Sequence, residues 1–389
     1  MPQTLTLIIT LLTLSNVLSR PVRAETLTVC LEGGCDFTSI QSAIDAASNG
    51  DVIEIAGETY FVDQAVDTLG KAIVLRGAID EVTGAPLTVL DGQSAGRVLQ
   101  CLNEEGPGTV FENLVFQSGV QTQGGGMYCD GSSPTITNCT FTNNFAVSGG
   151  GMYLTRGSSP SITNSRFTNN AATYRGGGIY TIDGCAPSIT DSSFTGNNAV
   201  NRGGALSNFN GSAARLTRCT FTNNAAEDGG GGIDNNNSLP TITECTFTFN
   251  STNGRGGGVL NSSGSFLGAP TFTDCTFTEN FATEGGGGMH SSLTNPTLTG
   301  TRACENTPDQ ITGLYTCSGD QCVSALCSDC DTCPGDLGED GEVNGADLTT
   351  LLDQWGCTGE DCTADLDGNG TVDGLDLVTI LCNWGACSN

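Results

Sequence analysis

A repeat of about 26 residues runs from residue 116 to residue 306, and it constrains the fold more than any other feature of this chain. Each unit contains a glycine run, an apolar residue, a polar stretch, a Pro-Thr-Ile-Thr-like segment and a Cys-Thr-Phe-like segment. One unit of this length cannot bury an apolar face alone, so successive units must stack and share a core. The repeat therefore predicts a solenoid of short strands.

An asparagine follows ten residues after the proline, or its one alanine substitute, that marks each repeat. Each coil must turn sharply between strands, and asparagine tolerates the left-handed backbone conformation that a turn needs. Rungs of a parallel sheet lie about 4.8 Å apart, so stacked amide side chains can hydrogen-bond as a ladder. The seven asparagines are Asn144, Asn170, Asn197, Asn224, Asn250, Asn280 and Asn306.

Three inward rows of apolar side chains are expected, because residues at one phase of successive coils lie above one another. Each row supplies one side chain per rung to a thin, continuous core. The first row is Phe141, Phe167, Phe194, Phe221, Phe247 and Phe277; the second is Ile136, Ile162, Ile189, Leu216, Ile242, Phe272 and Leu298; the third is Met127, Met152, Ile179, Ala205, Ile233, Val259 and Met289.

A further phase of the repeat contains four cysteines and is interrupted by Ser165 and Ser192. Small, buried thiols are the interpretation that we favour for this phase. Disulfides between adjacent rungs are the alternative. The four cysteines are Cys139, Cys219, Cys245 and Cys275.

An amphipathic helix is predicted close to the start of the chain. Residues 37–47 place Ile40, Ala43, Ile44 and Ala47 on one helical face, and an Asn-Gly pair then ends the helix. Short strands follow. A helix at this position can cover the open end of a coil stack, which otherwise exposes unpaired strand groups.

Two segments carry a resemblance to known families. Residues 37–60, FTSIQSAIDAASNGDVIEIAGETY, resemble the capping segment of the pectin-lyase-like superfamily, and the repeat GGGMY…SSPTITNCTFTNN resembles the polymorphic outer-membrane-protein type. The resemblance implies an all-β fold, a right-handed single-stranded parallel β-helix with an N-terminal helical cap. It does not imply one activity, because this scaffold carries lyases, hydrolases and adhesins.

Charge excludes one class of partner. The formal net charge is −29, and Lys71 is the only lysine. A surface of this sign repels phosphate backbones, so we expect no nucleic-acid partner. It favours divalent cations instead.

The first 24 residues have the features of a secretory signal peptide. An apolar run covers residues 5–18, and Val22-Arg23-Ala24 offers a small-x-small cleavage site before Glu25. An uncleaved anchor is the alternative, although the run is short for a membrane span. The 19 cysteines also fit an oxidising compartment, and their odd number leaves at least one unpaired. We expect a secreted or cell-surface protein, monomeric and without a transmembrane span when mature.

A second repeat, in the acidic C-terminal region, contains two candidate calcium loops, each followed by a helical pattern. The second loop has oxygen ligands at positions 1, 3, 5, 9 and 12, glycine at position 6 and a backbone carbonyl at position 7, which suits a hard cation. The first loop has Gly338 at position 3, so its site is expected to be weaker. The predicted Ca²⁺ ligands are Asp365, Asp367, Asn369, Thr371, Asp373 and Asp376 in the second loop, and Asp336, Asp340, Glu342, Asn344 and Asp347 in the first.

Two loop-helix units with Asp at position 12 resemble the type I dockerin domain, which is EF-hand-like, over residues 333–389. The resemblance implies attachment of a carbohydrate-active protein to a cohesin-bearing scaffold. Dockerin recognition usually uses polar residues at loop positions 10 and 11, where this chain has Gly345-Ala346 and Gly374-Leu375. The calcium fold is therefore expected, whereas a cohesin-like partner is a weaker expectation.

A candidate glycan-binding tract lies on one face of the repeats. Three tyrosines share an outward phase that continues through Leu206, Asp234, Leu260 and His290. Charged residues precede successive glycine runs and should stack on one edge; they are Arg175, Arg202, Asp228, Arg255 and Glu284. A sugar chain could lie on such a platform, while a stabilising aromatic stack beside a solvated charge ladder is the alternative. The candidate residues are Tyr128, Tyr153, Tyr180, Arg175, Arg202, Asp183 and Asp234.

No catalytic residue is assigned. His290 is the only histidine, so a Ser-His or Cys-His scheme is not supported, and a surface role is favoured for it over a ligand role. Hydrolysis of a glycosidic bond needs paired carboxylates, and pectate-lyase-like elimination needs a base with calcium. We expect a protein that binds polysaccharide or cell-surface glycan, with or without cleaving it; the alternative is a noncatalytic structural or adhesin-type β-helix.

The domain organisation follows from these segments. The expected parts are a signal peptide (1–24), a cap with the first coils (25–115), the β-helix repeats (116–306), a Cys-rich linker (307–332) and a small α-helical calcium-loop domain (333–389).

Overall fold

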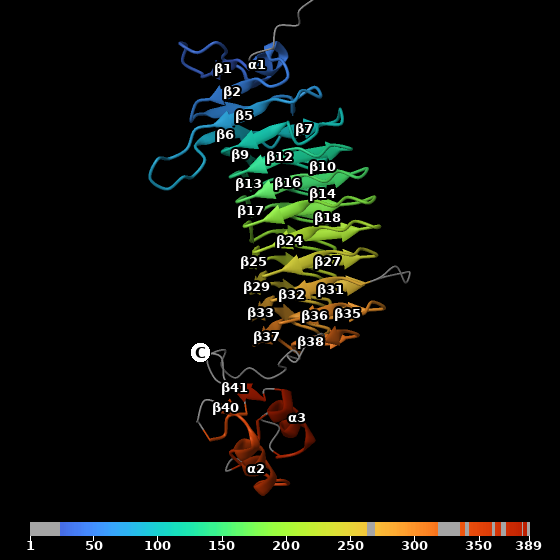
Figure 1. Ribbon diagram of the computed structural model, residues 1–389. Coiled ribbons are helices and arrows are strands. Elements are labelled where there is room, and N and C mark those ends of the chain that lie inside the picture. Colours follow the sequence, from blue (N-terminus) through green and yellow to red (C-terminus); the bar gives the residue numbers. More distant parts are fainter. Residues whose placement is uncertain are drawn as a thin grey trace, which may run out of the picture.

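The computed structural model describes residues 24–262, 269–317, 335–338, 342–359, 362–366, 371–382 and 384–386. The chain winds into a tall stack of coils in which all strands of the stack pair in parallel (Figure 1). The predicted parallel β-helix is confirmed. Most repeat coils contribute four strands, one to each of four sheets, which we call sheets A, B, C and the lobe sheet.

Sheets A and B carry the Thr-Ile-Thr and Thr-Phe-Thr segments, with the middle residue of each segment inside. Sheet A contains β1 (Thr26–Val29), β2 (Val52–Ile55), β5 (Val74–Gly77), β8 (Val110–Glu112), β12 (Thr135–Thr137), β16 (Ser161–Thr163), β20 (Ser188–Thr190), β24 (Arg215–Thr217), β28 (Thr241–Thr243), β32 (Thr271–Thr273), β36 (Thr297–Thr299) and β39 (Thr316–Cys317). Sheet B contains β3 (Thr59–Phe61), β6 (Thr88–Asp91), β9 (Leu114–Gln117), β13 (Thr140–Thr142), β17 (Arg166–Thr168), β21 (Ser193–Thr195), β25 (Thr220–Thr222), β29 (Thr246–Thr248), β33 (Thr276–Thr278) and β37 (Arg302–Cys304).

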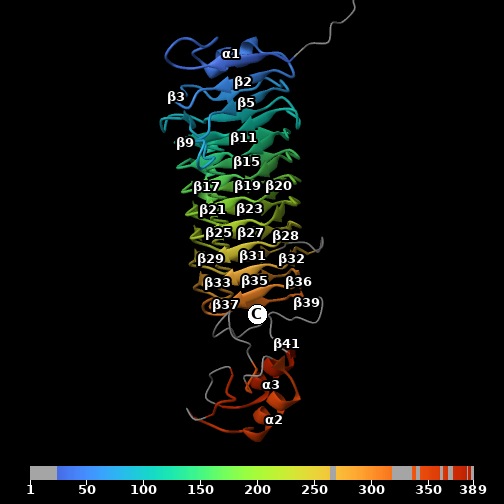
Figure 2. The same cartoon turned by 60° about the vertical axis from the view of Figure 1, so that its left-hand side comes forward.

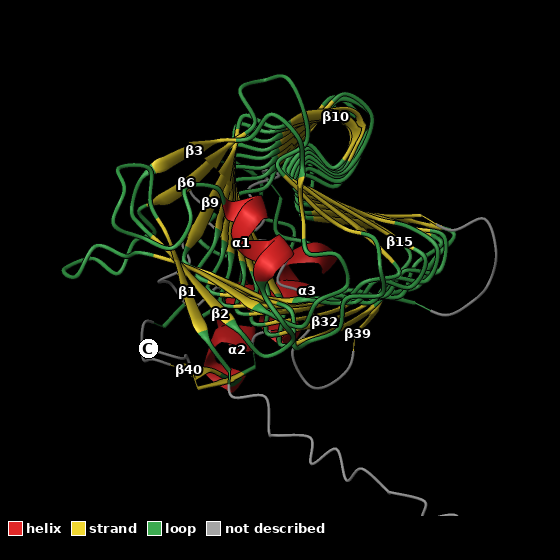
Figure 3. Ribbon diagram, turned by 90° about the horizontal axis from the view of Figure 1, so that it is seen from above, coloured by secondary structure: helices red, strands yellow, loops and turns green. Residues whose placement is uncertain are grey.

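The lobe sheet projects beside sheet C when the molecule is seen from above (Figure 3), and the glycine runs connect the two. The lobe sheet contains β10 (Val120–Gln123), β14 (Phe145–Ser148), β18 (Ala171–Arg175), β22 (Asn198–Ala199), β26 (Ala225–Ala226), β30 (Ser251–Thr252) and β34 (Phe281–Ala282). Sheet C contains β4 (Val66–Asp67), β7 (Leu99–Cys101), β11 (Met127–Asp130), β15 (Met152–Thr155), β19 (Ile179–Thr181), β23 (Leu206–Phe209), β27 (Ile233–Asn236), β31 (Val259–Ser262), β35 (Met289–Ser292) and β38 (Ile311–Gly313).

The predicted asparagine ladder is present, and all seven of its side chains are buried. Asn170 Nδ2 donates to Asn197 Oδ1 at 3.0 Å, and Asn197 Nδ2 donates to Asn224 Oδ1 at 3.0 Å. Each amide also donates to a phenylalanine carbonyl of the preceding rung, as Asn197 does to Phe167 at 2.8 Å. The ladder therefore satisfies backbone groups that the turn leaves unpaired.

The predicted left-handed conformation of the ladder asparagines is wrong, because the residue just before each one adopts it. That residue is Asn143 (φ 54°) in one coil and Phe249 (φ 55°) in another. Both side chains are exposed, so several residue types fit there. The ladder position has an inward amide that must both donate and accept, which explains why it is asparagine throughout.

The inner rows agree with the sequence prediction at all but one position. Rings of the phenylalanine row stack 4.6 to 4.8 Å apart from Phe116 to Phe277. In the third row, Leu206 rather than Ala205 pairs with Ile179. Ala205 takes the place of the third glycine of its run, and this moves the following residues by one position.

The cysteine-serine row is buried, and its four cysteines are unbonded in the structure. Backbone N–H groups reach the next rung's side chain: Cys139 N donates to Ser165 Oγ at 3.2 Å, and Cys219 N donates to Cys245 Sγ at 3.4 Å. Serine and cysteine are therefore interchangeable acceptors at this turn. The prediction that these side chains are buried is confirmed.

A second buried polar column, inside sheet C, was not predicted. Thr181 Oγ1 donates to Asn208 Oδ1, Asn208 Nδ2 to Asn235 Oδ1, and Asn235 Nδ2 to Asn261 Oδ1, each at 2.9 Å. Apolar side chains occupy the same column in earlier coils, for example Leu154. The change of residue type along the column hid it from sequence reasoning.

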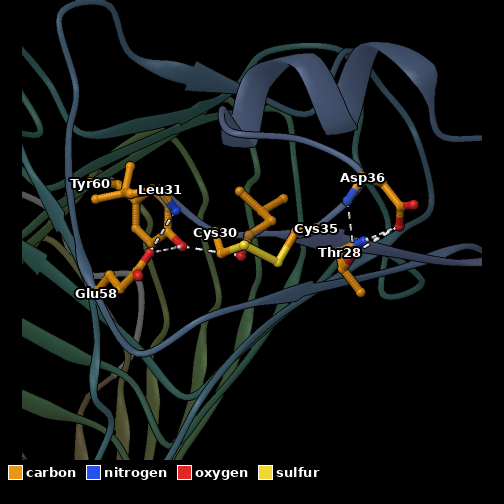
Figure 4. Close-up of a disulfide and its surroundings, with 8 residues drawn as sticks. Thr28, Cys30, Leu31, Cys35, Asp36, Glu58 and Tyr60 are labelled. Carbon is orange, nitrogen blue, oxygen red and sulfur yellow. Dashed lines mark hydrogen bonds between the residues drawn. A yellow bond between two sulfur atoms is a disulfide. The ribbon is translucent and has the colours of Figure 1, made fainter. Parts of the chain in front are cut away.

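Helix α1 (Ile40–Ala46) covers the first coil, as predicted, and packs on β1, β2 and β4 (Figure 2). Ser39 caps it by accepting a hydrogen bond from Ser42 N. A disulfide between Cys30 and Cys35 closes the loop before this helix (Figure 4).

The C-terminal unit has a small core of its own, which includes Val343, Leu351, Val372 and Ile380. It contains α2 (Gly345–Asp353), α3 (Gly374–Cys382), and the antiparallel pair β40 (Glu342–Val343) and β41 (Gly385–Ala386). A second disulfide joins Cys357 and Cys362. The predicted signal peptide, most of the predicted Cys-rich linker and part of the calcium loops lie outside the described residues.

Candidate functional site

The outer row of sheet C brings the three candidate tyrosines together. Tyr128 pairs with Tyr153 and Tyr153 with Tyr180, and their ring centroids lie 5.5 and 5.3 Å apart. The row continues through Ser207 and then Asp234. The prediction of Leu206 in this row is wrong, because the same one-residue shift at Ala205 turns Leu206 inward.

Burial limits what the tyrosines can contact. Tyr153 is 7% exposed and Tyr180 is 5% exposed, whereas Tyr128 is half-buried. The glycine runs lie close over this row: a Cβ on Gly176 would be 2.8 Å from the Cβ of Tyr180. Tyr153 and Tyr180 thus form an enclosed aromatic stack, and Tyr128 is the most exposed of the three tyrosines.

Arg175, at the end of β18, reaches across two rungs to Asp234 on β27, with Nη1 3.0 Å from Oδ2. Both side chains are buried, and Ser207 Oγ also donates to Asp234 Oδ2 at 3.0 Å. Burial raises the pKa of Asp234, although the charges of Arg175 and Arg202 oppose this. Asp234 Oδ1 and Arg175 Nε are buried without hydrogen-bond partners among the described residues.

Two residues absent from the predicted site complete this face. Phe209 stacks against Tyr180 with ring centroids 6.4 Å apart, and the Arg175 guanidinium lies 4.8 Å from the Phe209 ring centroid. Arg97 lies 4.6 Å from the Tyr128 ring centroid at the other end of the row. The register partner of Tyr128 one rung back is Gln100, three residues after Arg97, and this rung precedes the clear repeat, so the repeat phase did not mark Arg97.

The edge row of charges is only partly as predicted. Arg175 pairs with Arg202 across the rungs, but Arg202 pairs next with Gly229, which in turn pairs with Arg255, so Asp228 is displaced from the row. Arg202 is half-buried and has no hydrogen bond or ion pair from its guanidinium among the described residues.

Asp183 lies apart from the Arg175–Asp234 pair. It is exposed in the turn that follows β19, where its Oδ1 accepts a hydrogen bond from Asn210 Nδ2 at 2.9 Å. His290 occupies the outer row near the far end of sheet C. Its ring nitrogens lie 2.8 Å from Thr312 Oγ1 and 2.7 Å from Ser292 Oγ, and burial lowers its pKa.

The acidic loops present a matching arrangement at loop position 12. Asp347 accepts hydrogen bonds from Gly338 N at 2.9 Å and Asn344 N at 2.8 Å. Asp376 accepts from Leu366 N and Asp373 N, both at 2.7 Å. Both carboxylates are buried at the start of their helices and bound to their own loops.

The remaining predicted loop ligands divide into two groups. Asp336, Glu342, Asn344, Asp365, Thr371 and Asp373 are described, and all belong to the loops that lead into α2 and α3. Asp340, Asp367 and Asn369 lie outside the described residues. The described donors are carboxylate, amide and carbonyl oxygens, which is the donor chemistry of a hard divalent cation.

No described part of the chain gathers three or more His, Cys, Asp or Glu side chains in a group that could hold a metal ion. Asp234 is the only carboxylate in the buried cluster with Arg175 and Ser207. None of the described helices is long and apolar enough to span a membrane.

Residues 125–303 match the protein family described as the right handed beta helix region, so the coil direction is right-handed, as predicted. No curated protein matches the chain. Solved structures with a similar arrangement include pectate lyase Pel9A (12% identity, 78% of each chain, TM-score 0.44). An alginate lyase from Paenibacillus sp. str. FPU-7 is also similar (14% identity, 76% of this chain and 99% of that one, TM-score 0.44), as is a pectin methylesterase from carrot (12% identity, 75% and 88%, TM-score 0.37). Likeness at these identities concerns the fold alone.

Proposed function

We propose that this protein binds an acidic polysaccharide along the outer face of sheet C. The observation that carries the proposal is Arg202, a half-buried guanidinium without an ion-pair partner among the described residues, next to the cluster of Arg175 and Asp234. In a chain of net charge −29, this guanidinium places positive charge beside the aromatic row. Its planar fork fits the carboxylate of a uronic acid.

The aromatic ends of the row support the same proposal. Tyr128 and Phe209 are half-buried, and each lies against an arginine, Arg97 and Arg175 respectively. Aromatic and arginine groups side by side offer an apolar surface and charged donors to a sugar ring. The buried Tyr153 and Tyr180 then act as the support that holds these ends in place.

Binding is proposed ahead of cleavage. Hydrolysis needs two carboxylates flanking the scissile bond, and the buried cluster supplies only Asp234. Asp234 is fully enclosed, so it holds Arg175 rather than facing a substrate. A noncatalytic glycan-binding rod is the simplest function that this face supports.

The test compares Arg202→Ala with Arg166→Ala, because Arg166 is an exposed arginine on sheet B, away from the proposed face. Affinity electrophoresis in gels containing polygalacturonate, alginate or neutral dextran gives the readout. We expect retardation by the acidic polymers only, and about tenfold weaker binding for Arg202→Ala, equivalent to about 1.4 kcal/mol. No retardation, or equal weakening by Arg166→Ala, would overturn the proposal; reducing ends or unsaturated products released in the same mixtures would show cleavage.

We also propose that the C-terminal loops bind calcium. The buried Asp347 and Asp376 at equivalent positions of two loops, 29 residues apart in sequence (376 − 347), support two related sites. Calcium titration by calorimetry of Asp365→Ala should show one site fewer than the wild type, because position 1 of the loop is lost. Asp353→Asn, an exposed carboxylate at the end of α2, is the charge control. Unchanged stoichiometry in Asp365→Ala would count against the second site.

Export and attachment complete the proposal. The disulfides Cys30–Cys35 and Cys357–Cys362 support an oxidising compartment. N-terminal sequencing of the mature chain should begin at Glu25 if the predicted cleavage occurs. A cohesin-like scaffold stays a prediction, and calcium-dependent binding of a purified cohesin to the full chain tests it.

A further inference from the structure

Buried thiols occupy the same column on neighbouring coils at two places in the β-helix. Cys101 on β7 and Cys129 on β11 are register partners inside sheet C. Cys219 and Cys245 follow one another in the cysteine-serine row, and Cys275 comes next. All five side chains are buried, and all are unbonded in the structure.

The spacing of the coils suits a covalent bond between such partners. Adjacent parallel strands lie about 4.8 Å apart, and disulfides span Cα separations of about 4.4 to 6.8 Å. Cys101 and Cys129 are direct register partners, and the backbone N–H of Cys219 donates to the Cys245 sulfur at 3.4 Å, so the side chains of each pair are neighbours.

Cys245 differs from the other cysteines of its row. The Cys275 thiol donates to two backbone carbonyls, Thr273 O at 3.3 Å and Ile242 O at 3.5 Å, and the thiols of Cys139 and Cys219 make the equivalent pairs of contacts. The Cys245 thiol, by contrast, donates to one carbonyl among the described residues, Thr243 O at 3.2 Å, and its sulfur accepts the backbone N–H of Cys219 at 3.4 Å. The contacts therefore favour Cys219–Cys245 over Cys245–Cys275.

We propose that oxidation joins Cys101 to Cys129 and Cys219 to Cys245, so that two disulfides staple neighbouring coils. The oxidant is a small-molecule disulfide. One cysteine thiolate attacks it and releases one thiol, and the second cysteine then attacks the mixed disulfide and releases the other. Two thiols of the chain are oxidised and the oxidant is reduced to two thiols, so the electrons balance.

These bonds form while the coils close rather than afterwards. All four thiols are 0 to 1% exposed in the finished fold, so an external disulfide cannot reach them. Burial also raises the pKa of Cys101, which suppresses the reactive thiolate. Protein folded under reducing conditions should therefore resist later oxidation, and protein refolded with oxidant should acquire both staples.

The test refolds the full chain in a buffer of reduced and oxidised glutathione. Remaining thiols are alkylated in denaturant, and the chain is cut without reduction. Cleavage after Phe116 and before Asp130 separates Cys101, Cys129 and Cys139, and cleavage after Phe221 and Phe247 separates the other three. Mass spectrometry should find Cys101 linked to Cys129 and Cys219 linked to Cys245, with Cys139 and Cys275 alkylated.

Cys139 is the matched control, because its neighbour on the next coil is Ser165. Cys101→Ser should leave Cys129 alkylated and lower the thermal midpoint of the oxidised protein, while Cys139→Ser should change neither linkage. Alkylation of Cys101 and Cys129 to the same extent as Cys139 would overturn the proposal, as would linkage among random partners.

Discussion

At the scale of the residue, the fold depends on buried amides whose every hydrogen bond is defined. Asn197 occupies the middle of the ladder and is fully buried. Its Oδ1 accepts from both Asn170 N and Asn170 Nδ2, and its Nδ2 donates to Phe167 O and Asn224 Oδ1. No other side chain of similar length both donates and accepts in this way.

We predict that Asn197→Ala lowers the free energy of unfolding by about 2 to 4 kcal/mol, because it leaves several buried polar groups unpaired at about 1 to 3 kcal/mol each. Chemical denaturation followed by circular dichroism measures the change. Asn198→Ala is the control, since Asn198 is adjacent and exposed. Equal effects of the two substitutions would show that the ladder contributes little.

Glu105 predicts a pH dependence of stability. Burial alone would raise its pKa, but hydrogen bonds from Asn103 N (2.8 Å), Ser132 Oγ (2.8 Å) and Thr68 Oγ1 (2.8 Å) lower the pKa below its usual value. A folded pKa below the unfolded value of about 4.3 means that the charged group stabilises the fold above that pH. This contribution is lost as the pH falls through the folded pKa.

Glu105→Gln should therefore reduce stability at neutral pH and flatten the loss of stability on acidification. Urea midpoints across a series from about pH 7 to about pH 3, spanning the usual glutamate pKa, measure both effects. Glu104→Gln, at the exposed neighbouring position, should keep the wild-type slope. A wild-type slope in Glu105→Gln would contradict the role assigned to this carboxylate.

At the scale of the element, the glycine runs between the lobe sheet and sheet C allow backbone to pack directly on backbone. Gly150 N donates to Gly176 O, and Gly151 N to Gly177 O, so the runs pair from coil to coil. A Cβ on Gly150 would come within 2.6 Å of Gly177 O and closer still to Ala171 O. Contact with neighbouring backbone therefore excludes a side chain at this position. This steric reason is independent of the φ angle of the glycine.

Gly150→Ala is predicted to destabilise the protein by about 3 kcal/mol or more, because the neighbouring backbones must separate. Gly96→Ala is the matched control, since a Cβ on Gly96 meets no atom within 4 Å. Thermal midpoints of the two variants give the comparison. A Gly150→Ala protein as stable as Gly96→Ala would mean that the glycine runs are looser than their contacts indicate.

At the scale of the whole molecule, two separate hydrophobic cores predict two unfolding events. The long core of the β-helix and the small core around Val343, Leu351 and Ile380 share no residue. Both tryptophans of the chain, Trp355 and Trp384, lie in the C-terminal unit. Tryptophan fluorescence therefore reports on this unit alone.

If the acidic loops bind calcium as proposed, EDTA should lower the thermal midpoint seen by tryptophan fluorescence, because removing a ligand removes its linkage stabilisation. The midpoint of the main circular dichroism transition, which follows the β-helix, should stay unchanged. Added magnesium in place of EDTA serves as the control for divalent charge. A single transition seen by both probes, or no response to EDTA, would contradict this prediction.

The architecture follows from the sequence alone, because a strict period leaves one way to bury the apolar rows. The phases of the asparagines, phenylalanines and glycines predict the rungs and the ladder, and the separate amphipathic pattern of residues 37–47 predicts the capping helix. One substitution was enough to mislead: Ala205 stands where a third glycine was expected, and it moved Leu206 inward and Ser207 outward.

Contacts between different columns of the coil stack depend on the tertiary structure. Arg175, at the end of a lobe-sheet strand, reaches Asp234 on sheet C two rungs away, and Phe209, at the end of β23, stacks on Tyr180 of the neighbouring strand (Figure 3). The sequence marked Arg175, Asp234 and the tyrosines as candidates but could not show that Tyr153 and Tyr180 are enclosed. A periodic sequence specifies neighbours along a column, whereas contacts across columns depend on side-chain reach and loop path, which the period does not encode.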